Sequence, residues 1–537
     1  MKKKPLTPHQ KDILKKYVSL VKNVRLSPSR ADLHAVGISR DKFRHHFSNI
    51  KGIRTAAMEH FPEVFKGVID VYNYASAKRE KDLKKEVKKF KRFFITTAVN
   101  KERIHKGFMK SIEGYCKEKN AKLLILPCLD SNSKSEAEVE WHFDDKLLDH
   151  PLVFGRLDLN SNIHTSCIKV GAKTVNPVGG LGIYSQGKGT FIFASPKQFL
   201  EYDAVANNKM PHARMSPGAC TIPNDLNKTN SSKTDFMYNY THTVGGIIVE
   251  IEDNEIFYFR QVQADVNGHF ADLGKLYTGR KSKTIIPKLV MGDYHAGEHD
   301  ETVIGSWEEI IDEFKVDEVI FHDIFNGRSI NHHEKDNIIL RSRRSQNNHL
   351  ALDGELREVS VQLDRIMKHK SVKKGVIVRS NHDDFLDRWL QAARFKDDPL
   401  NFQIGCKLAD KAVDGLDPLQ EGIKLIRPLK TNKTMIWLKR DEDYIIAGIE
   451  CGAHGDKGPN GSRGGKAGLE KAYGKCNIAH SHTPGILRGV FQVGTSTLLR
   501  LGYNIGPSSW VHCSLLQYPN GQRQLINSIN GKWHLAD

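Results

Sequence analysis

The residues best suited to chemistry lie in the C-terminal half of the chain, where five short apolar runs each end in Asp, Asn or His. Apolar runs of this length are typical of buried strands. Ligands of open α/β sheets bind beyond the carboxyl ends of the strands, so we expect the polar clusters to meet at such an edge. The runs and their clusters are Ile285–Met291 with Asp293 and His295, Glu318–Phe321 with His322 and Asp323, Gly375–Arg379 with Asn381, His382 and Asp383, Tyr444–Ile449 with His454, and Cys476–Ala479 with His480 and His482.

The residue types in these clusters indicate a metal centre. Carboxylate, amide and imidazole groups suit Mn²⁺, Fe or Zn²⁺ better than an ion that prefers thiolate. The eight cysteines are scattered and form no CxxC pair, which argues against a zinc ribbon and against a disulfide framework. Each cluster alone has a structural interpretation, because a strand that ends in Asp and a single loop histidine are both common. The order of all five along the chain makes the metal centre the better interpretation.

That order, D-x-H, D, N-H-D, H-G and H-x-H, resembles the calcineurin-like metallophosphoesterase family over roughly residues 285–520. The resemblance implies a four-layer α/β/β/α sandwich with two adjacent metal sites. Cys451 is close in sequence to His454 but is not a ligand in that family. The implied ligands are Asp293, His295 and His482 for the first metal, Asn381, His454 and His480 for the second, and Asp323 as the bridge between them.

The resemblance also implies a reaction. Two divalent ions about 4 Å apart lower the pKa of a water between them and hold phosphoryl oxygens for in-line attack. His382 would lie beside the leaving group, where it would either stabilise the developing charge or protonate the departing oxygen. Asp383 would either orient His382 or cap a helix that starts near Phe385.

Three positions depart from the family pattern. The glycine expected before the bridging aspartate is His322, the one before Asn-His-Asp is Ser380, and the one before the final His-x-His is Ala479. Every implied metal ligand is nevertheless present, so the departures affect the assignment of the substrate more than that of the metals. For His322 we consider two roles, an additional substrate contact and a packing role.

Helical periodicity between the clusters completes an alternation of strands and helices, as in Trp307–Phe314 and Leu356–His369. We therefore predict an α/β fold and a catalytic domain over residues 285–537.

Residues 95–284 are predicted to be a mixed α/β region of unknown role. Two strand-like runs, Phe93–Val99 and Lys122–Leu126, flank a helical run at Lys101–Lys119. The rest of the region is rich in Gly, Asn, Ser and Thr, with no catalytic constellation, and its histidines 212, 242 and 269 are isolated and more typical of structural residues. Further strand-like runs are Gly189–Ala194, Gly245–Ile251 and Ile256–Val262.

Residues 1–94 are predicted to form a basic, all-helical domain. They hold 24 Lys and Arg against 9 Asp and Glu, a net charge of +15 out of +18 for the whole chain. Such an asymmetry indicates a polyanionic partner, with a solvated helical face as the alternative. Helical spacing is seen at Ile13, Tyr17, Leu20 and Val21 and over Ala75–Lys91.

Residues 28–47 resemble the helix-turn-helix of TetR-like DNA-binding heads. A short helix would end at Gly37, and Ser39 would cap a second helix. Ile38, Phe43 and Phe47 would face the core, and the alternative is an ordinary helical hairpin. The residues left to contact DNA would be Arg40, Lys42, Arg44 and His45.

DNA is the substrate that these features favour. The basic head and the helix-turn-helix-like segment would bind it, and Arg341, Arg343 and Arg344 would line a path beside the metals, unless they form a solvated loop. The whole chain resembles the early host-DNA-degrading metallophosphoesterase nucleases of large tailed phages, and its site is similar to that of SbcD-type nucleases. The resemblance implies a nuclease with two divalent ions, Mn²⁺ first and Fe or Zn²⁺ as alternatives, that acts as a homo-oligomer in the bacterial host cytoplasm.

Two other functions remain open. One is a phosphatase or phosphodiesterase that acts on a substrate other than nucleic acid, because the same site serves different substrates in different relatives. The other is a DNA-binding regulator with a vestigial phosphoesterase domain, against which the intact ligand set argues. No apolar run approaches the ~18 residues of a membrane span, and no apolar signal region is evident, so we expect a soluble protein without a membrane partner.

Overall fold

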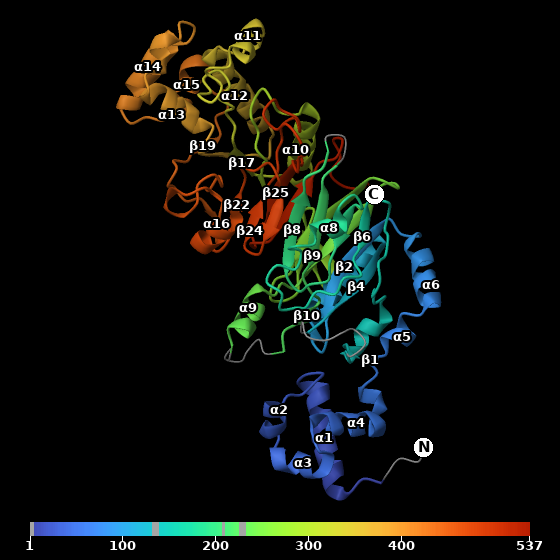
Figure 1. The fold of residues 1–537 in the computed structure, drawn as a ribbon. Coiled ribbons are helices and arrows are strands. Elements are labelled where there is room, and N and C mark those ends of the chain that lie inside the picture. The colour runs from blue at the N-terminus through green and yellow to red at the C-terminus, as the bar shows by residue number, and fades with distance from the viewer. Residues whose placement is uncertain (1–4, 131–138, 207–209, 225–231, 537) are drawn as a thin grey trace.

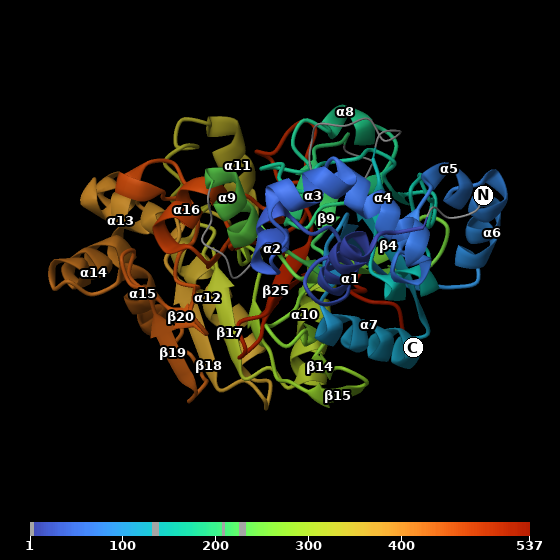
Figure 2. The ribbon, with the colours of Figure 1, turned by 90° about the horizontal axis from the view of Figure 1, so that it is seen from below.

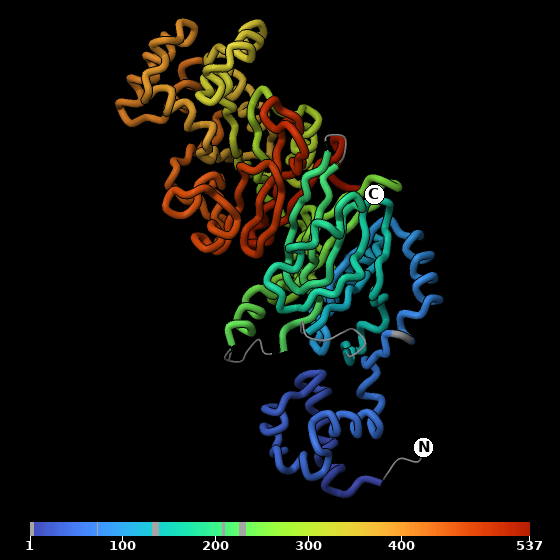
Figure 3. The backbone as a smooth tube through the Cα atoms, in the orientation of Figure 1, coloured from blue at the N-terminus to red at the C-terminus, as the bar shows by residue number. Residues whose placement is uncertain are grey.

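The computed structural model describes residues 5–130, 139–206, 210–224 and 232–536, and its fold is mixed α/β, as predicted (Figure 1). A helical head lies at one end of the molecule, a group of helices lies at the other, and β-sheets fill the middle. In Figure 3 the head is joined to the rest of the chain by a narrow connection. The division of the chain into residues 1–94, 95–284 and 285–537 remains a prediction.

The head has its own apolar core, to which Ile13, Tyr17 and Leu20 contribute at the predicted helical spacing. A short strand, β1 (Val68–Ile69), pairs with β5 (Trp141–His142), so residues 1–94 are not helical throughout. The helices of the head are α1 (Pro8–Asn23), α2 (Arg30–Ala35), α3 (Arg40–Phe47) and α4 (Ile50–His60).

The turn between α2 and α3 has the predicted local geometry. Gly37 has φ +77°, a conformation that costs glycine little. The Ser39 side chain accepts a hydrogen bond from the Lys42 backbone N–H and so caps α3. Ile38 and Phe43 are buried and Phe47 packs against the same core. The exposed side chains of α3 are the predicted Arg40, Lys42, Arg44 and His45, together with the acidic Asp41.

Arg54 fixes the head to the middle of the molecule. Its guanidinium donates to the Leu26 carbonyl at 3.2 Å, lies 2.9 Å from His142 Nδ1 and pairs with Glu140. The short α5 (Val71–Tyr74) and α6 (Ala77–Val87) follow the head, and Glu86 of α6 pairs with Lys122 at 2.6 Å. The helical run predicted at Ala75–Lys91 corresponds to α6.

A βαβ unit opens the middle region, as predicted. Strand β2 (Arg92–Val99) runs parallel to β4 (Ala121–Cys128), with α7 (Lys106–Lys119) between them in sequence. The helix begins at Lys106, not at Lys101, because β3 (Arg103–Ile104) first pairs with β10 (Thr221–Ile222). Strands β11 (Gly245–Ile251) and β12 (Phe257–Gln263) complete the order β12-β11-β2-β4.

One sheet, which we call the first sheet, has the order β19-β18-β17-β16-β25-β26. Strands β16 to β19 are parallel, and one face of the sheet packs on α10 (Glu301–Phe314) and α12 (Leu352–Met367) through a shared core that includes Trp307, Val359 and Phe321. The strands are β16 (Lys288–Val290), β17 (Glu318–His322), β18 (Lys374–Val378), β19 (Thr434–Trp437), β25 (Cys513–Gln517) and β26 (Arg523–Asn527).

The opposite face of the first sheet packs on another, which we call the second sheet, with the order β20-β21-β22-β24-β23-β8-β9-β7-β6. Ile320 of the first sheet shares a core with Phe491 and Met215 of the second. Leu487 of β23 pairs with Phe199 of β8. The second sheet therefore combines strands from the predicted catalytic domain, residues 285–537, with strands from the predicted middle region. The strands are β6 (Ile163–Thr165), β7 (Thr190–Ile192), β8 (Gln198–Asp203), β9 (His212–Pro217), β20 (Ile445–Ile446), β21 (Ile449–Glu450), β22 (Cys476–Ile478), β23 (Gly485–Leu487) and β24 (Val490–Gln492).

The single strand predicted over Tyr444–Ile449 is wrong. The chain turns back at Ala447 and Gly448, which have φ +51° and +76°, and β20 and β21 form an antiparallel hairpin. The apolar run hides this turn, because only Gly448 marks it in the sequence.

The remaining helices lie outside the sheets. Figure 2 shows α13, α14 and α15 grouped on one side of the molecule, away from α6 and α7. No helix in the described part of the chain combines the length and the apolar character that a lipid bilayer requires. The other elements are α8 (Gly182–Ser185), α9 (Lys233–Thr241), α11 (Ile338–Gln346), α13 (Asp383–Gln391), α14 (Phe402–Val413), α15 (Pro418–Ile426), α16 (Lys466–Tyr473), β13 (Phe270–Asp272), β14 (Lys275–Thr278) and β15 (Lys281–Thr284).

A buried ion network ties the middle region together and yields a stability prediction. Arg260 is 1% exposed and donates to Asp272 and Glu250, each at 2.8 Å. Arg260→Met would leave two carboxylates buried without their partner, so we expect a loss of about 3–5 kcal/mol in the free energy of unfolding. Lys532→Met is the matched control, because the Lys532 side chain is 63% exposed and its pair with Glu252 should contribute less than about 1 kcal/mol. Denaturant unfolding measures both, and equal losses would contradict the role of the network.

Candidate metal centre

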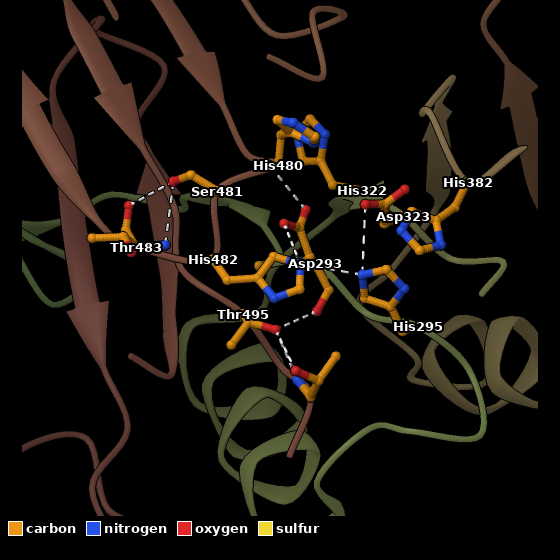
Figure 4. Close-up of polar contacts among 12 residues, drawn as sticks. Asp293, His295, His322, Asp323, His382, His480, Ser481, His482, Thr483 and Thr495 are labelled. Atoms are coloured by element: carbon orange, nitrogen blue, oxygen red, sulfur yellow. Dashed lines mark hydrogen bonds and ion pairs between the residues drawn. The ribbon is translucent and has the colours of Figure 1, made fainter. Parts of the chain in front are cut away.

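The five polar clusters meet at one buried place between the two sheets (Figure 4). The first sheet contributes the residues that follow β16, β17 and β18, and the second sheet contributes those that follow β21 and β22. The residues come from the ends of strands in two sheets that pack face to face. The seven residues are Asp293, His295, Asp323 and Asn381 from the first sheet and His454, His480 and His482 from the second.

One half of the centre joins His295 and His482, whose Nε2 atoms lie 3.2 Å apart. His482 Nε2 also lies 3.2 Å from Asp293 Oδ2, and His295 Nε2 lies 3.5 Å from Asp323 Oδ2. Two imidazole nitrogens and two carboxylate oxygens thus point at a common volume. Each of these side chains is almost completely buried.

The other half is built around His454 and Asn381. His454 Nε2 lies 3.2 Å from Asp323 Oδ2 and 3.1 Å from Asn381 Oδ1. His480 Nδ1 lies 3.0 Å from the same Asn381 oxygen. Asp323 therefore belongs to both halves of the centre.

These groups could hold a metal ion. His295, Asp323 and His482 form one set of ligand atoms within 4.8 Å of one another, and Asp293, Asp323 and His454 form another. Asp323 Oδ1 has no hydrogen-bond partner among the residues that the structure describes. A buried carboxylate oxygen without a partner is unfavourable, and a cation would satisfy it.

The backbone is strained at these positions. His295, Asp323, His480 and His482 have φ of +45°, +47°, +71° and +57°, values that non-glycine residues seldom adopt. Such strain persists where the surroundings enforce it and is concentrated at functional sites. Here the His295 N–H donates to the Asp323 carbonyl at 2.7 Å, and the Ser496 N–H donates to the Asp293 carbonyl at 2.8 Å.

The charges at the centre are strongly coupled. Burial and the charge of Asp323 raise the pKa of Asp293 to about 8. Burial also acts to raise the pKa of Asp323, but His454, His382 and His295 outweigh it and hold that pKa well below its usual range. Burial acts to lower the pKa of His454, but the negative charge of Asp323 raises it to about 9. A cation bound by these groups would balance the negative charge and favour their deprotonated forms.

His382 lies at the edge of the centre, with its ring centroid 4.4 Å from that of His295. Its Nδ1 lies 2.6 Å from the Asn326 carbonyl oxygen, which therefore orients the ring. Asp383 does not take that role. Its carboxylate accepts a hydrogen bond from the Ser380 N–H at 2.9 Å. The helix α13 begins at Asp383 itself and has no side-chain cap, so the expected capping of a helix that starts at Phe385 is not observed. The sequence carries no signal for Asn326, because any residue there would supply a carbonyl.

His322 lies behind His454, with 3.4 Å between their Nδ1 atoms. It is fully buried, and burial lowers its pKa to about 3, which keeps the ring neutral. Its position agrees with the packing role and leaves no surface for contact with a substrate.

The predicted DNA contacts do not lie together. Arg341, Arg343 and Arg344 are on α11, at the end of the molecule opposite the head (Figure 1). Arg343 is exposed, whereas Arg344 pairs with Glu334 and donates to the Arg328 carbonyl at 2.8 Å. Arg344 thus has a structural role, and any DNA held by α3 of the head is far from these arginines.

Fold and site together define a mixed α/β protein with a buried histidine–aspartate centre that could hold metal ions. No protein-family model and no solved structure matches the chain. The chain belongs to the same family as Protein A1 of Escherichia phage T5. The two are 30% identical over 478 residues, which cover 83% of this chain and 84% of the phage T5 protein.

The shared position of Asp323 yields a prediction about metal binding. Asp323→Asn keeps the size of the side chain but removes the charge that both halves of the centre share. Loss of a residue that only hydrogen-bonds to a metal ligand lowers metal affinity by ~10–100-fold. Asp323 is itself an implied ligand, so we expect its substitution to lower Mn²⁺ affinity by more than that. Bound Mn²⁺ should raise the Tm of the wild-type protein and not that of the variant.

Mass-spectrometric metal content and differential scanning fluorimetry measure the two effects. Asp336→Asn is the matched control, because that side chain is 88% exposed. Equal Mn²⁺ content in the wild type and Asp323→Asn would refute a metal site at Asp323.

Proposed function

We propose that this protein is a two-metal DNA nuclease that hydrolyses phosphodiester bonds and has the four-layer α/β/β/α arrangement of calcineurin-like metallophosphoesterases. The observation that carries the proposal is the convergence of all seven implied ligands on one buried centre, with Asp323 shared between its halves. Random placement of seven residues from two sheets would not bring their ligand atoms within hydrogen-bond distance of one another. The first sheet packs on helices with one face and on the second sheet with the other face. This layering supports the fold assignment.

The donor set fits two divalent ions. Asp293, His295 and His482 would hold the first ion, and Asn381, His454 and His480 the second, with Asp323 between them. Imidazole and oxygen donors fit Mn²⁺, with Fe or Zn²⁺ as alternatives. Two such ions supply Lewis-acid polarisation of the phosphate and a water nucleophile that is active near neutral pH.

His382 would act on the leaving group. The Asn326 carbonyl can only accept a hydrogen bond, so Nδ1 of His382 carries the proton of the neutral ring. A second proton would therefore reside on Nε2, from which the ring can protonate the departing oxygen. The neighbouring His295 ring and Phe385, at 4.4 and 4.8 Å between centroids, hold the imidazole in place.

The head supports DNA as the substrate. Residues 1–94, which include the head and α6, carry a net charge of +15 that would bind phosphates without regard to sequence, and α3 of the head carries basic side chains exposed to solvent. The family relative is a phage protein, which fits degradation of host DNA in the bacterial cytoplasm. Assembly into a homo-oligomer stays a prediction of the sequence resemblance.

One assay tests the proposal. Purified protein should degrade plasmid DNA with Mn²⁺ and not with EDTA, and His480→Ala should abolish cleavage while DNA binding remains. His269→Ala is the control, because its half-exposed ring pairs with Asp265 in the middle region. Hydrolysis of a phosphomonoester while both plasmid and single-stranded DNA stay intact would favour a phosphatase. Salt-sensitive DNA binding without any hydrolysis would favour a regulator.

The head yields a separate prediction. Replacement of Arg40, Lys42 and Arg44 by Glu should weaken binding of duplex DNA, because α3 would lose its positive surface. The slope of log affinity against log salt should fall by about 0.9 for each phosphate that the variant no longer binds. Fluorescence anisotropy across a salt series measures both quantities, and an unchanged slope would exclude α3 from DNA binding.

A further inference from the structure

Two aromatic side chains stand beside the metal centre on the loop between β24 and β25. The Trp510 ring lies against His482, with 4.0 Å between the ring centroids. Tyr503 lies next to Trp510, with 5.8 Å between centroids and 62° between the ring planes. Tyr503 is 56% exposed, so a large aromatic surface faces solvent directly beside the implied ligands.

A series of ring contacts crosses the centre from Trp510 to the opposite side. Each ring contacts the next, with centroids 3.9–5.2 Å apart along the series. The two implied ligands, His482 and His295, are the second and third rings of the series, so Trp510 lies on one side of the metal centre and the other rings lie on the opposite side. The series runs Trp510, His482, His295, His382, Phe385, His332 and His333.

The end opposite Trp510 carries exposed cations. Lys335 follows His333 by two residues, and Arg388 lies on α13 three residues after Phe385, whose ring contacts His332. Arg388 and Lys335 are exposed, and Lys335 pairs with Asp336 at 3.8 Å. The side of the centre away from Trp510 thus offers cations in addition to rings.

Nucleotides have the matching chemistry. A nucleobase stacks on an aromatic face, whereas its phosphates pair with cations. A strand that crosses the centre can therefore place a base on the aromatic side, its next phosphates on the basic side and one phosphodiester between them. The exposed apolar side chains of the same loop, Leu498 and Ile505, extend the surface for a base.

We propose that Tyr503 and Trp510 form a stacking platform for the nucleobase next to the phosphodiester that is cut. This inference rests on the proposed nuclease function and specifies its substrate. A base that stacks on a protein ring must leave the base stack of its own strand, and this costs least in single-stranded, frayed or gapped DNA. The platform therefore favours such DNA over intact duplex. It is also indifferent to sequence, because every base has a π-face.

The test compares the KM for an intact single-stranded oligonucleotide with the KM for the same oligonucleotide carrying abasic residues. Wild-type protein should bind the abasic strand about tenfold more weakly, as the loss of one stacked base predicts. Tyr503→Leu should bind the intact strand about tenfold more weakly and respond little to abasic residues, because its platform is already reduced. Tyr503→Phe keeps the ring and should restore the wild-type response.

Tyr240→Leu is the matched control, because Tyr240 is 67% exposed on α9 in the middle region. It should retain the wild-type KM and abasic response. An equal abasic response in the wild type and Tyr503→Leu would overturn the platform and leave the nuclease function intact. If the wild-type protein cleaves neither DNA nor the simple phosphodiester methyl 4-nitrophenyl phosphate, the nuclease function is overturned, and the platform with it.

Discussion

The position of Asp323 constrains the whole centre. Its buried carboxylate lies 3.2 Å from His454 and 3.5 Å from His295, on two sides of one site, and shares that site with Asp293. Burial and the repulsion between these two carboxylates together raise the pKa of Asp293. The neighbouring imidazoles compensate for part of the negative charge, and a pair of cations would compensate for it more completely.

The two packed sheets serve this constraint. Ligands that follow β16, β17 and β18 approach from the first sheet, and those that follow β21 and β22 approach from the second. The shared core of Ile320, Phe491 and Met215 holds the sheets together, so the separation of the ligands depends on apolar packing. The backbone is strained where these side chains turn toward the centre. The residues with left-handed φ are His295, Asp323, His480 and His482.

The sequence predicted the site better than its scaffold. Asp293, His454 and His480 stand out because each follows an apolar run in a recognisable order, and the turn at Gly37 stands out because glycine and serine have specific roles there. The pairing of strands in the second sheet was not predictable. The predicted runs Gly189–Ala194 and Cys476–Ala479 contain β7 and β22, but β8 pairs with β23 across almost 290 positions of sequence. The orienting group of His382 is a main-chain carbonyl, and the Trp510 ring is near His482 only in three dimensions, so neither left a pattern to detect.

The central claim is that two metal ions lie between the sheets at Asp323. Anomalous diffraction at the manganese edge, from crystals grown with Mn²⁺, tests it most directly. Two peaks are expected, one among Asp293, His295 and His482 and one among Asn381, His454 and His480, with Asp323 contacting both. An absence of peaks at these residues, or a Mn²⁺ ion bound elsewhere while the centre stays empty, would contradict the claim.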